Sequence, residues 1–259
     1  MANWADLGPR IASAAVMSVV GAIAIWQGSW VFLALVLVAV AVMVWEILTI
    51  CEHGQTRLYI VLPIAFSAML FLFSLLSGVS VFTILASLLL AIGIGYELRK
   101  VHIIGGVMLL AVFWVGYGLI DFRTNQGLPF IFWLLLVVIA SDVMGYFAGR
   151  TFGGPKFWPS ISPKKTWSGT IAGWGGAALV GLGFVVWHGS PALLIPLSVF
   201  TAFAGQMGDI AESALKRRTG VKDSSNLIPG HGGVLDRFDA VSGAVLFLLV
   251  MSLFLPVSV

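Results

Sequence analysis

Charged residues are scarce in this sequence. Only 10% of its 259 residues are charged, whereas 59% are hydrophobic and the mean hydropathy is +1.04. A soluble globular domain usually has about 25% charged residues, so this composition excludes one. We therefore expect a polytopic membrane protein that forms one continuous membrane domain.

Several common sequence features are also missing. Cys51 is the only cysteine, which excludes an intrachain disulfide and gives no metal-site spacing. The N-terminus has no basic region followed by a small-residue cleavage site, so no cleavable signal peptide is expected. Neither G-x-x-x-x-G-K-[ST] nor G-x-S-x-G occurs, and P-loop hydrolysis and α/β-hydrolase chemistry therefore find no support.

Long apolar runs are abundant, and they predict an all-α membrane bundle. Each run is near the length of about 20 residues that a helix needs to cross the hydrocarbon core, where backbone polar groups must be satisfied within the segment. The nine runs lie near 11–27, 30–50, 58–76, 79–96, 102–120, 128–148, 169–188, 192–215 and 240–257. The first two could instead form a re-entrant hairpin. Residues 1–120 are interpreted as N-terminal transmembrane helices, and 121–259 as a catalytic transmembrane region with cytoplasmic loops.

The basic residues favour one side of this predicted bundle. With nine spans, the N-terminus and the connections after spans 2, 4, 6 and 8 carry 13 of the 14 Lys and Arg residues. These are Arg10, Arg57, Arg99, Lys100, Arg150, Lys156, Lys164, Lys165, Lys216, Arg217, Arg218, Lys222 and Arg237. Only Arg123 falls on the other side. The positive-inside rule makes the basic side cytoplasmic and places the N-terminus inside.

The charges of the first 120 residues lie mostly near predicted span ends. We interpret most of them as interfacial anchors; they include Glu46, Glu52, Arg57, Glu97, Arg99 and Lys100. Three of the four histidines, His53, His102 and His188, also lie near span ends, without metal-ligand spacing. Between Asp142 and Asp239, by contrast, there are nine basic and six acidic residues. This stretch suits a highly charged substrate beside a membrane.

The connection after span 6 contains the first candidate groups. Asp142 lies inside the end of the span, where a carboxylate needs a metal, a base or a water-filled cavity, although a structural ion pair is the alternative. Ser162-Pro163 resembles a helix start, and Thr166 and Ser168 could offer donors to an anion beside Lys164 and Lys165. Adjacent lysines at a membrane face also commonly contact lipid headgroups.

The connection after span 8 carries more information. Asp209, Glu212, Ser213 and Lys216 are spaced to line one stripe if span 8 continues as a helix, although such a row can be an ordinary ion-pair ladder. The run Pro229-Gly-His-Gly-Gly233 follows. Its three glycines permit positive φ and close approach of backbone amides to a ligand.

Carboxylates recur on either side of this glycine-rich run. Asp236 and Asp239 flank Arg237 at the predicted start of span 9, where aspartates also favour a helix N-terminus electrostatically. With Asp209 and Asp142 they offer several hard oxygen ligands near one cytoplasmic level. Oxygen ligation with nearby cations suits Mg²⁺ held jointly by carboxylates and substrate phosphates. Nucleotide chemistry follows from this combination.

The segment from Ser213 to Asp239 resembles the signature of the phosphatidate cytidylyltransferases, also called CDP-diacylglycerol synthases. Its matching positions are Ser213, Leu215, Lys216, Arg217, Lys222, Asp223, Ser225, Ile228, Pro229, His231, Gly232, Gly233, Val234, Asp236, Arg237, Phe238 and Asp239. Asp142 with Tyr146, the run Ser162–Trp167, and Gly208-Asp209 also resemble the family. Ser168 and Ala240 depart from its pattern, but neither change removes a carboxylate or a lysine.

This resemblance implies a Mg²⁺-dependent reaction in which CTP and phosphatidic acid give CDP-diacylglycerol and pyrophosphate in phospholipid biosynthesis. We assign Asp209 and Asp236 as its metal ligands, with Asp142, Asp223 and Asp239 as further candidates that bind the metal directly or support its ligands. The candidate catalytic residues are Asp209, Lys216, Arg217, Lys222, Asp223, His231, Asp236 and Arg237. The candidate substrate-binding residues are Lys164, Lys165, Ser213, Gly232 and Gly233. His231 either donates to a phosphate or orients the glycine loop.

Three alternatives stay open at this stage. An ether-lipid cytidylyltransferase would share much of the site, and a CTP-dependent polyprenol kinase would attack the γ-phosphorus instead. An organic-anion transporter is the remote alternative, since transporters place their charges near the bilayer midplane. The expected partners are CTP, phosphatidic acid and membrane lipid, with no nucleic acid, and a homodimer is left open. The expected location is a bacterial inner membrane, with the active site facing the cytoplasm.

Overall fold

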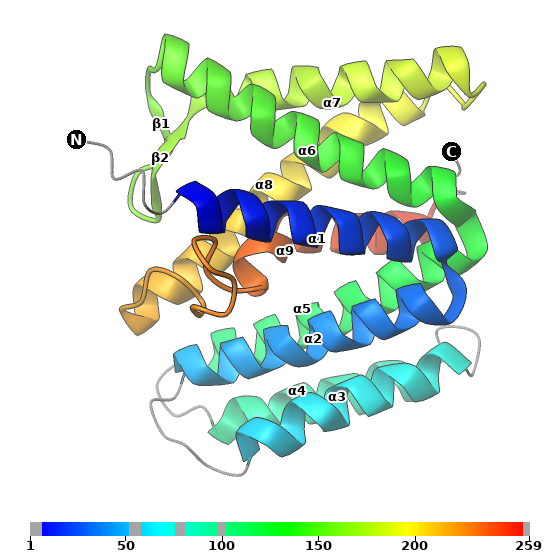
Figure 1. Cartoon of the computed structure of the whole chain (residues 1–259), viewed down its shortest axis with the longest axis vertical. Coiled ribbons are helices and arrows are strands. Elements are labelled where there is room, and N and C mark those ends of the chain that lie inside the picture. Colours follow the sequence, from blue (N-terminus) through cyan, green and yellow to red (C-terminus); the bar gives the residue numbers. More distant parts are fainter. Residues whose placement is uncertain (1–6, 52–57, 76–80, 98–101, 256–259) are drawn as a thin grey trace. The chain divides into compact units, whose positions relative to one another are not determined.

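The computed structural model describes residues 7–51, 58–75, 81–97 and 102–255, and it is predominantly α-helical (Figure 1). Its helices are α1 (Leu7–Gln27), α2 (Ser29–Cys51), α3 (Leu58–Leu75), α4 (Val81–Glu97), α5 (His102–Asp121), α6 (Gly127–Phe152), α7 (Trp167–Trp187), α8 (Leu194–Thr219) and α9 (Leu235–Ser252). A π-helical turn, Phe122–Gln126, precedes α6, and a short hairpin of β1 (Lys156–Trp158) and β2 (Ser162–Thr166) precedes α7. The predicted all-α class is confirmed.

Each predicted apolar run corresponds to one of these helices, with ends that differ by a few residues. Four helical stretches of the described residues are long and apolar enough to cross a membrane: Ser29–Cys51, Ile103–Phe152, Trp167–Trp187 and Leu194–Thr219. Shorter apolar helices occupy Ile11–Gln27, Tyr59–Leu75 and Phe82–Ile94. These helices indicate a membrane protein, and the count of nine spans stays a prediction. Glu52, His53, Arg57, Arg99 and Lys100 lie outside the described residues.

The chain divides into two compact units. The first comprises Met1–Thr124 and Leu215–Phe238, and the second comprises Asn125–Ala214 and Asp239–Val259. Helices α8 and α9 each contribute residues to both units. The segment that contains the glycine-rich run thus groups with the N-terminal helices, whereas the predicted division at residue 120 stays a prediction.

In the first unit, α2, α3, α4 and α5 pack side by side (Figure 1). Phe113 of α5 meets Phe66 and Phe73 of α3 edge to face, with ring centroids 6.4 and 5.9 Å apart. Gly116 lets α5 approach its neighbours, since a Cβ there would lie 2.6 Å from side-chain atoms of Leu70 and Val40. The core of this unit is therefore built from interlocking aromatic and aliphatic side chains.

Arg123 has a structural partner in the first unit. Its Nε donates to the carbonyl of Ile25 at 3.0 Å, and its Nη2 donates to that of Trp26 at 3.4 Å. These carbonyls belong to the last turn of α1, which ends before Gly28 at φ 62°. A cation at a helix C-terminus satisfies unpaired carbonyls and opposes the negative end of the helix dipole.

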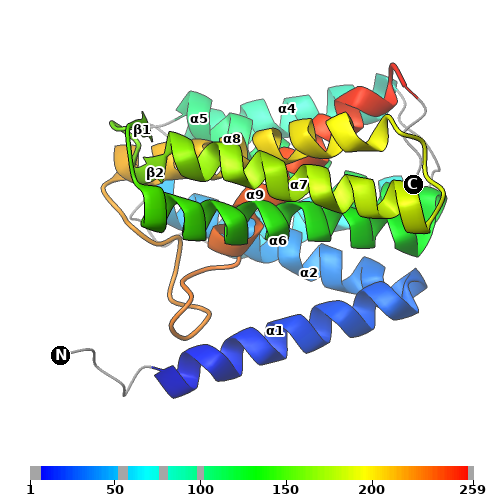
Figure 2. The ribbon, with the colours of Figure 1, turned by 90° about the horizontal axis from the view of Figure 1, so that it is seen from above.

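In the second unit, α6 and α7 lie alongside one another (Figure 2). The buried side chain of Gln206 on α8 connects both of them. Its Nε2 donates to Ser141 Oγ of α6 and to the carbonyl of Thr170 of α7, and its Oε1 accepts from Trp174 Nε1. A buried amide satisfied in this way fixes the three helices at one level.

The hairpin corrects one expectation. Ser162 was predicted to begin a helix, but Ser162–Thr166 forms β2, and α7 begins at Trp167. Thr166 is extended at φ −117° and accepts a hydrogen bond from Gly169 N, so it is the N-cap. Ser168 Oγ donates to the carbonyl of Gly153 and contacts Thr166 Oγ1 at 3.0 Å. Both hydroxyls that were expected to face an anion therefore bind locally.

The close packing of α8 against α9 within the second unit gives a testable prediction. A Cβ on Gly243 would clash with the carbonyl of Ala204 and lie 2.9 Å from Gly208 N. We expect Gly243→Ala to lower the thermal unfolding midpoint in detergent by several degrees, because backbone atoms cannot move aside as a flexible side chain does. Gly175→Ala on α7 is the matched control, since a Cβ there meets nothing within 4 Å. Equal midpoints for the two variants would contradict this packing.

Candidate active site

The predicted site residues divide between the two units. The first unit holds Lys216, Arg217, Lys222, Asp223, His231, Gly232, Gly233, Asp236 and Arg237. The second holds Asp142, Lys164, Lys165, Asp209, Ser213 and Asp239. α8 continues to Thr219, which confirms the helix on which the stripe of Asp209, Ser213 and Lys216 depends.

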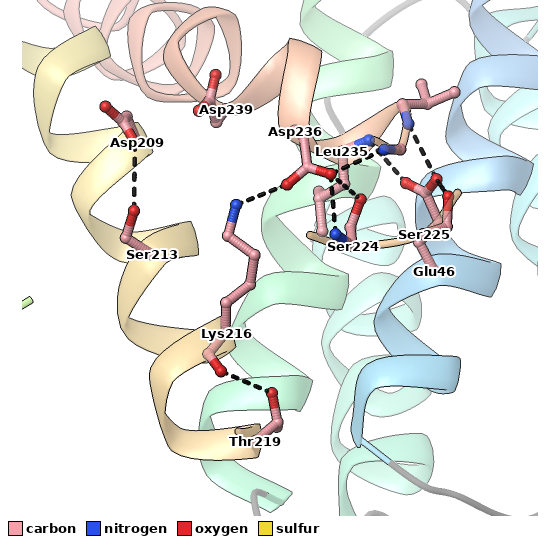
Figure 3. Close-up of polar contacts among 12 residues, drawn as sticks. Glu46, Asp209, Ser213, Lys216, Thr219, Ser224, Ser225, Leu235, Asp236 and Asp239 are labelled. Atoms are coloured by element: carbon pink, nitrogen blue, oxygen red, sulfur yellow. Dashed lines mark hydrogen bonds and ion pairs between the residues drawn. The ribbon is translucent and has the colours of Figure 1, made fainter. Parts of the chain in front are cut away.

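Asp236, in the first turn of α9, is the centre of the first group (Figure 3). Its Oδ1 accepts from Lys216 Nζ at 2.6 Å, and the two side chains are only 5% and 13% exposed. Its Oδ2 accepts from Ser224 N, Ser224 Oγ and Gly233 N at 2.7–2.8 Å. One carboxylate thus joins α8, the start of the loop between α8 and α9, and the end of that loop.

These contacts determine the charge of Asp236. Burial by itself raises the pKa of its carboxyl, but the hydrogen bonds from Lys216, Gly233 and Ser224 outweigh burial and lower the pKa from 3.8 to about 2. Asp236 is therefore ionised at neutral pH. The charge of Lys216 is balanced by it in a setting that is largely shielded from water.

The glycines of the loop allow these contacts. Gly230 and Gly232 have φ of 74° and 82°, which non-glycine residues rarely adopt. A Cβ on Gly232 would lie 2.6 Å from Asp236 Oδ2, and one on Gly233 would clash with Ser224 Oγ and Glu46 Oε1. The glycines were expected to let backbone amides approach a ligand; in the structure they let the amides approach carboxylates of the protein itself.

His231 is tied to α1. Ser13 Oγ donates to the carbonyl of Pro229 at 3.0 Å and lies 2.8 Å from His231 Nδ1, and Figure 2 shows the loop projecting towards α1. The hydroxyl of Ser13 thus lies within hydrogen-bond distance of both the backbone and the imidazole ring of the loop. These two contacts hold the His231 ring beside α1.

Glu46 of α2 is the residue that the sequence interpretation placed wrongly. It was interpreted as an interfacial anchor, but it is fully buried, and its carboxylate accepts hydrogen bonds from Ser225 Oγ, Val234 N and Leu235 N (Figure 3). Its donors are 179 to 189 residues away in the sequence, so no local pattern could have identified the contact.

The second group is centred on Asp209 of α8. Asp209 Oδ2 pairs with Lys165 Nζ at 2.7 Å, and Oδ1 accepts from Ser213 Oγ at 3.3 Å. Lys165 and the exposed Lys164 are neighbours in β2. Lys165 Nζ also donates to the carbonyl of Gln206 at 3.1 Å. A lysine and an aspartate that the sequence places 44 positions apart are thereby brought together, with side chains 24% and 32% exposed.

The remaining candidates are mostly at the surface. Arg217, Lys222, Asp223, Arg237, Lys164 and Asp142 are exposed. α6 extends to Phe152, beyond its predicted end, so Asp142 lies further from the helix end than expected. Asp239 is half-buried, and its carbonyl is close to Gly208, the neighbour of Asp209. Exposed cations are available to polyanionic ligands at little desolvation cost.

The carboxylates suit a metal that takes few protein ligands. No group of three or more His, Cys, Asp or Glu side chains within the described residues is arranged to hold a metal alone. Mg²⁺ is usually held by one or two carboxylates together with water and substrate phosphates. Asp209 is partly exposed, and Asp236 has further acceptor capacity at Oδ1, where Lys216 is its donor. A partly exposed carboxylate such as that of Asp209 is the kind of ligand that Mg²⁺ takes from a protein.

Comparison with known proteins identifies the family. The model of the cytidylyltransferase family matches residues 8–255, which is nearly the whole chain. The chain belongs to the cytidylyltransferase family. The matched region of this cytidylyltransferase-family protein includes α1 and α2. Ser13 of α1 and Glu46 of α2 contact the loop between α8 and α9.

Three relatives carry the name phosphatidate cytidylyltransferase. The protein of Brucella abortus biovar 1 (strain 9-941) is 42% identical over 158 residues, 55% of this chain and 56% of the relative. That of Staphylococcus epidermidis is 42% identical, and that of Staphylococcus aureus (strain COL) is 39% identical, each over 137 residues, 51% of this chain and 53% of the relative. The match thus spans about half the length of these relatives.

The depressed pKa of Asp236 predicts how stability depends on pH. Because the folded-state pKa lies below the unfolded value of about 3.9, ionised Asp236 contributes about 2 kcal/mol above pH 4, which is lost as the pH falls towards 2. Asp236→Asn should therefore lower the free energy of unfolding in detergent by more at pH 5 than at pH 2. Exposed Asp223→Asn is the control and should show no such difference. If Asp236→Asn lowered the free energy of unfolding equally at pH 5 and pH 2, the stabilising role assigned to ionised Asp236 would be contradicted.

Proposed function

We propose that this protein transfers the cytidylyl group of CTP to phosphatidic acid, giving CDP-diacylglycerol and pyrophosphate. The main support is the name of the relatives, phosphatidate cytidylyltransferase, whose sequences are about 40% identical to this chain over 137 to 158 residues. The apolar helices add support, since they suit an enzyme whose lipid substrate lies in the membrane.

The chemistry asks little of a general base. An oxygen of the phosphatidate phosphate attacks the α-phosphorus of CTP, and the bond from that phosphorus to the oxygen bridging to the β-phosphate breaks. Pyrophosphate leaves with that oxygen, and no proton has to be removed from the ionised nucleophile. Catalysis then depends on positioning two anions and on balancing their charge.

The residues of this chain suit those tasks. Lys216 is oriented by Asp236, and Lys165 is oriented by Asp209. Both lysines are held at defined places before any ligand arrives, which lowers the cost of ordering them around phosphates. The exposed Arg217, Lys222, Arg237 and Lys164 supply further positive charge. His231, which Ser13 holds through Nδ1, is the proposed imidazole donor to a phosphate oxygen.

Mg²⁺ is the metal we propose for this reaction. Asp209 and Asp236 are its proposed ligands, with Asp239 and Asp142 as further candidates. When bound, Mg²⁺ would neutralise phosphate charge and polarise the α-phosphoryl group.

We propose further that the protein lies in a bacterial inner membrane with its site facing the cytoplasm. The uneven distribution of Lys and Arg supports this orientation, and CTP is a cytoplasmic nucleotide.

The first test is an assay in detergent micelles with Mg²⁺, CTP and phosphatidic acid, followed by identification of the products by mass. We expect a CDP-linked lipid and pyrophosphate, and no product when Mg²⁺ is chelated. CDP with a newly phosphorylated lipid would mean kinase chemistry. Absence of nucleotide turnover with any acidic lipid would contradict the proposal.

A second test concerns Asp209. Asp209→Asn removes a charge that balances Lys165 and could bind Mg²⁺, and we expect turnover to fall by about 100-fold or more. Asp121→Asn is the matched control because Asp121 ends α5, on the predicted opposite face, and it should retain turnover near that of the wild type. Similar turnover in the two variants would mean that the site is misplaced.

A further inference from the structure

Glu46 has a buried carboxylate that accepts hydrogen bonds from one short segment of the chain. Its Oε1 accepts from Ser225 Oγ at 2.7 Å and from Val234 N at 2.9 Å, while its Oε2 accepts from Leu235 N at 2.7 Å. The side chain is 0% exposed. All three donors lie in the segment from Ser225 to Leu235, so this carboxylate is committed to the loop between α8 and α9.

Two of these donors belong to the start of α9. Leu235 is the first residue of the helix, and Val234 immediately precedes it. Amides at a helix N-terminus lack intrahelical partners, and a negative charge there is also favoured by the helix dipole. Such amides are usually capped by a side chain of the preceding residues. Here the cap comes from α2, which is far away in the sequence.

Glu46 and Asp236 act on adjacent residues. Ser224 donates to Asp236, and its neighbour Ser225 donates to Glu46. At the other end of the loop, Gly233 donates to Asp236, and the next two amides donate to Glu46. The two carboxylates therefore close the base of the loop from both sides, and we call this arrangement the carboxylate clamp. His231 lies inside the loop that the clamp closes.

We propose that Glu46 is a positioning residue for cytidylyl transfer: it fixes Ser225 and the first amides of α9, and so sets the position of Asp236 and, through it, of Lys216. This inference rests on the proposed function. A buried carboxylate is expensive to desolvate, and this cost is offset here by donors of one loop, which would lose their acceptor if an apolar side chain replaced Glu46. Because the hydrogen bonds that Glu46 accepts come from this loop and the start of α9, its role is to hold the site residues of that segment in position.

Two conservative substitutions of Glu46 are expected to have different effects because they change its acceptor oxygens differently. Glu46→Gln keeps the size of the side chain but has one acceptor oxygen, so its amide group must face a donor of the loop. Glu46→Asp keeps both oxygens but withdraws them by one methylene, about 1.5 Å. A requirement for the carboxylate therefore predicts partial rescue by Asp relative to Gln. Thr49→Ala is the matched control, since Thr49 lies one turn along α2 and its hydroxyl bonds the carbonyl of Trp45 in its own helix.

The experiment compares kcat and KM for CTP and phosphatidic acid, measured well below each variant's unfolding midpoint in detergent. We expect Glu46→Gln to lower kcat at least 10-fold with KM changed less than threefold, Glu46→Asp to recover part of the loss, and Thr49→Ala to match the wild type. A loss of stability alone would reduce the amount of folded enzyme, not the kcat of the folded fraction. Wild-type kcat in Glu46→Gln would overturn the proposal, as would a loss confined to KM.

Two further measurements keep the outcome decisive. If Glu46→Gln does not fold, Ser225→Ala removes one donor to Glu46 without changing the backbone, and it should lower kcat severalfold; wild-type kcat there would overturn the proposal. Hydrogen exchange of the Val234 and Leu235 amides should accelerate in Glu46→Gln or Glu46→Asp. If the wild type makes no CDP-linked lipid, the proposed function fails, and unchanged exchange would separately overturn the positioning role.

Discussion

A carboxylate that leaves water must have its oxygens satisfied by donors or by a cation, and this constraint organises the segment from Lys216 to Asp236. Asp236 satisfies it with Lys216, Ser224 and Gly233, and Glu46 satisfies it with Ser225 and the first amides of α9. Each carboxylate is also the partner of groups that would otherwise be buried without an acceptor. The loop, the lysine and the start of the helix consequently take their places together.

The same physical demand explains the second unit. The helices of this unit are mostly apolar and have few polar side chains. Several of these polar side chains form hydrogen bonds or ion pairs with neighbouring elements. Gln206 joins α6, α7 and α8 through both ends of its amide, and Lys165 and Asp209 connect the hairpin to α8. Under the proposed function, anionic substrates would meet lysines whose positions are already set by aspartates, in surroundings where uncompensated charge is costly.

Sequence alone predicted much of this structure. Long apolar runs fixed the helical class and placed each helix to within a few residues, because backbone groups in an apolar setting have few alternatives. The spacing of Asp209 and Ser213 predicted a shared helix face, and their hydrogen bond is present. The β-hairpin was missed because the Ser-Pro pair also fits a helix start, whereas Thr166 is the residue that caps α7.

The contacts of Glu46 and Ser13 could not be predicted from the sequence, for a different reason. Their partners are about 180 to 220 residues away, and no periodicity or local motif encodes pairing over that distance. A lone glutamate near the end of an apolar run looks the same whether it faces lipid headgroups or caps another helix. Only the packing of α1 and α2 beside the loop distinguishes the two.

We propose above all that this chain moves the α-phosphorus of CTP, with its cytidine, onto phosphatidic acid. Parallel incubations with CTP labelled at the α-phosphate or at the γ-phosphate, followed by separation of lipid from aqueous phases, test it most directly. We expect the α label to enter the lipid phase, whereas the γ label should stay in aqueous pyrophosphate. Label from the γ position in the lipid would contradict it.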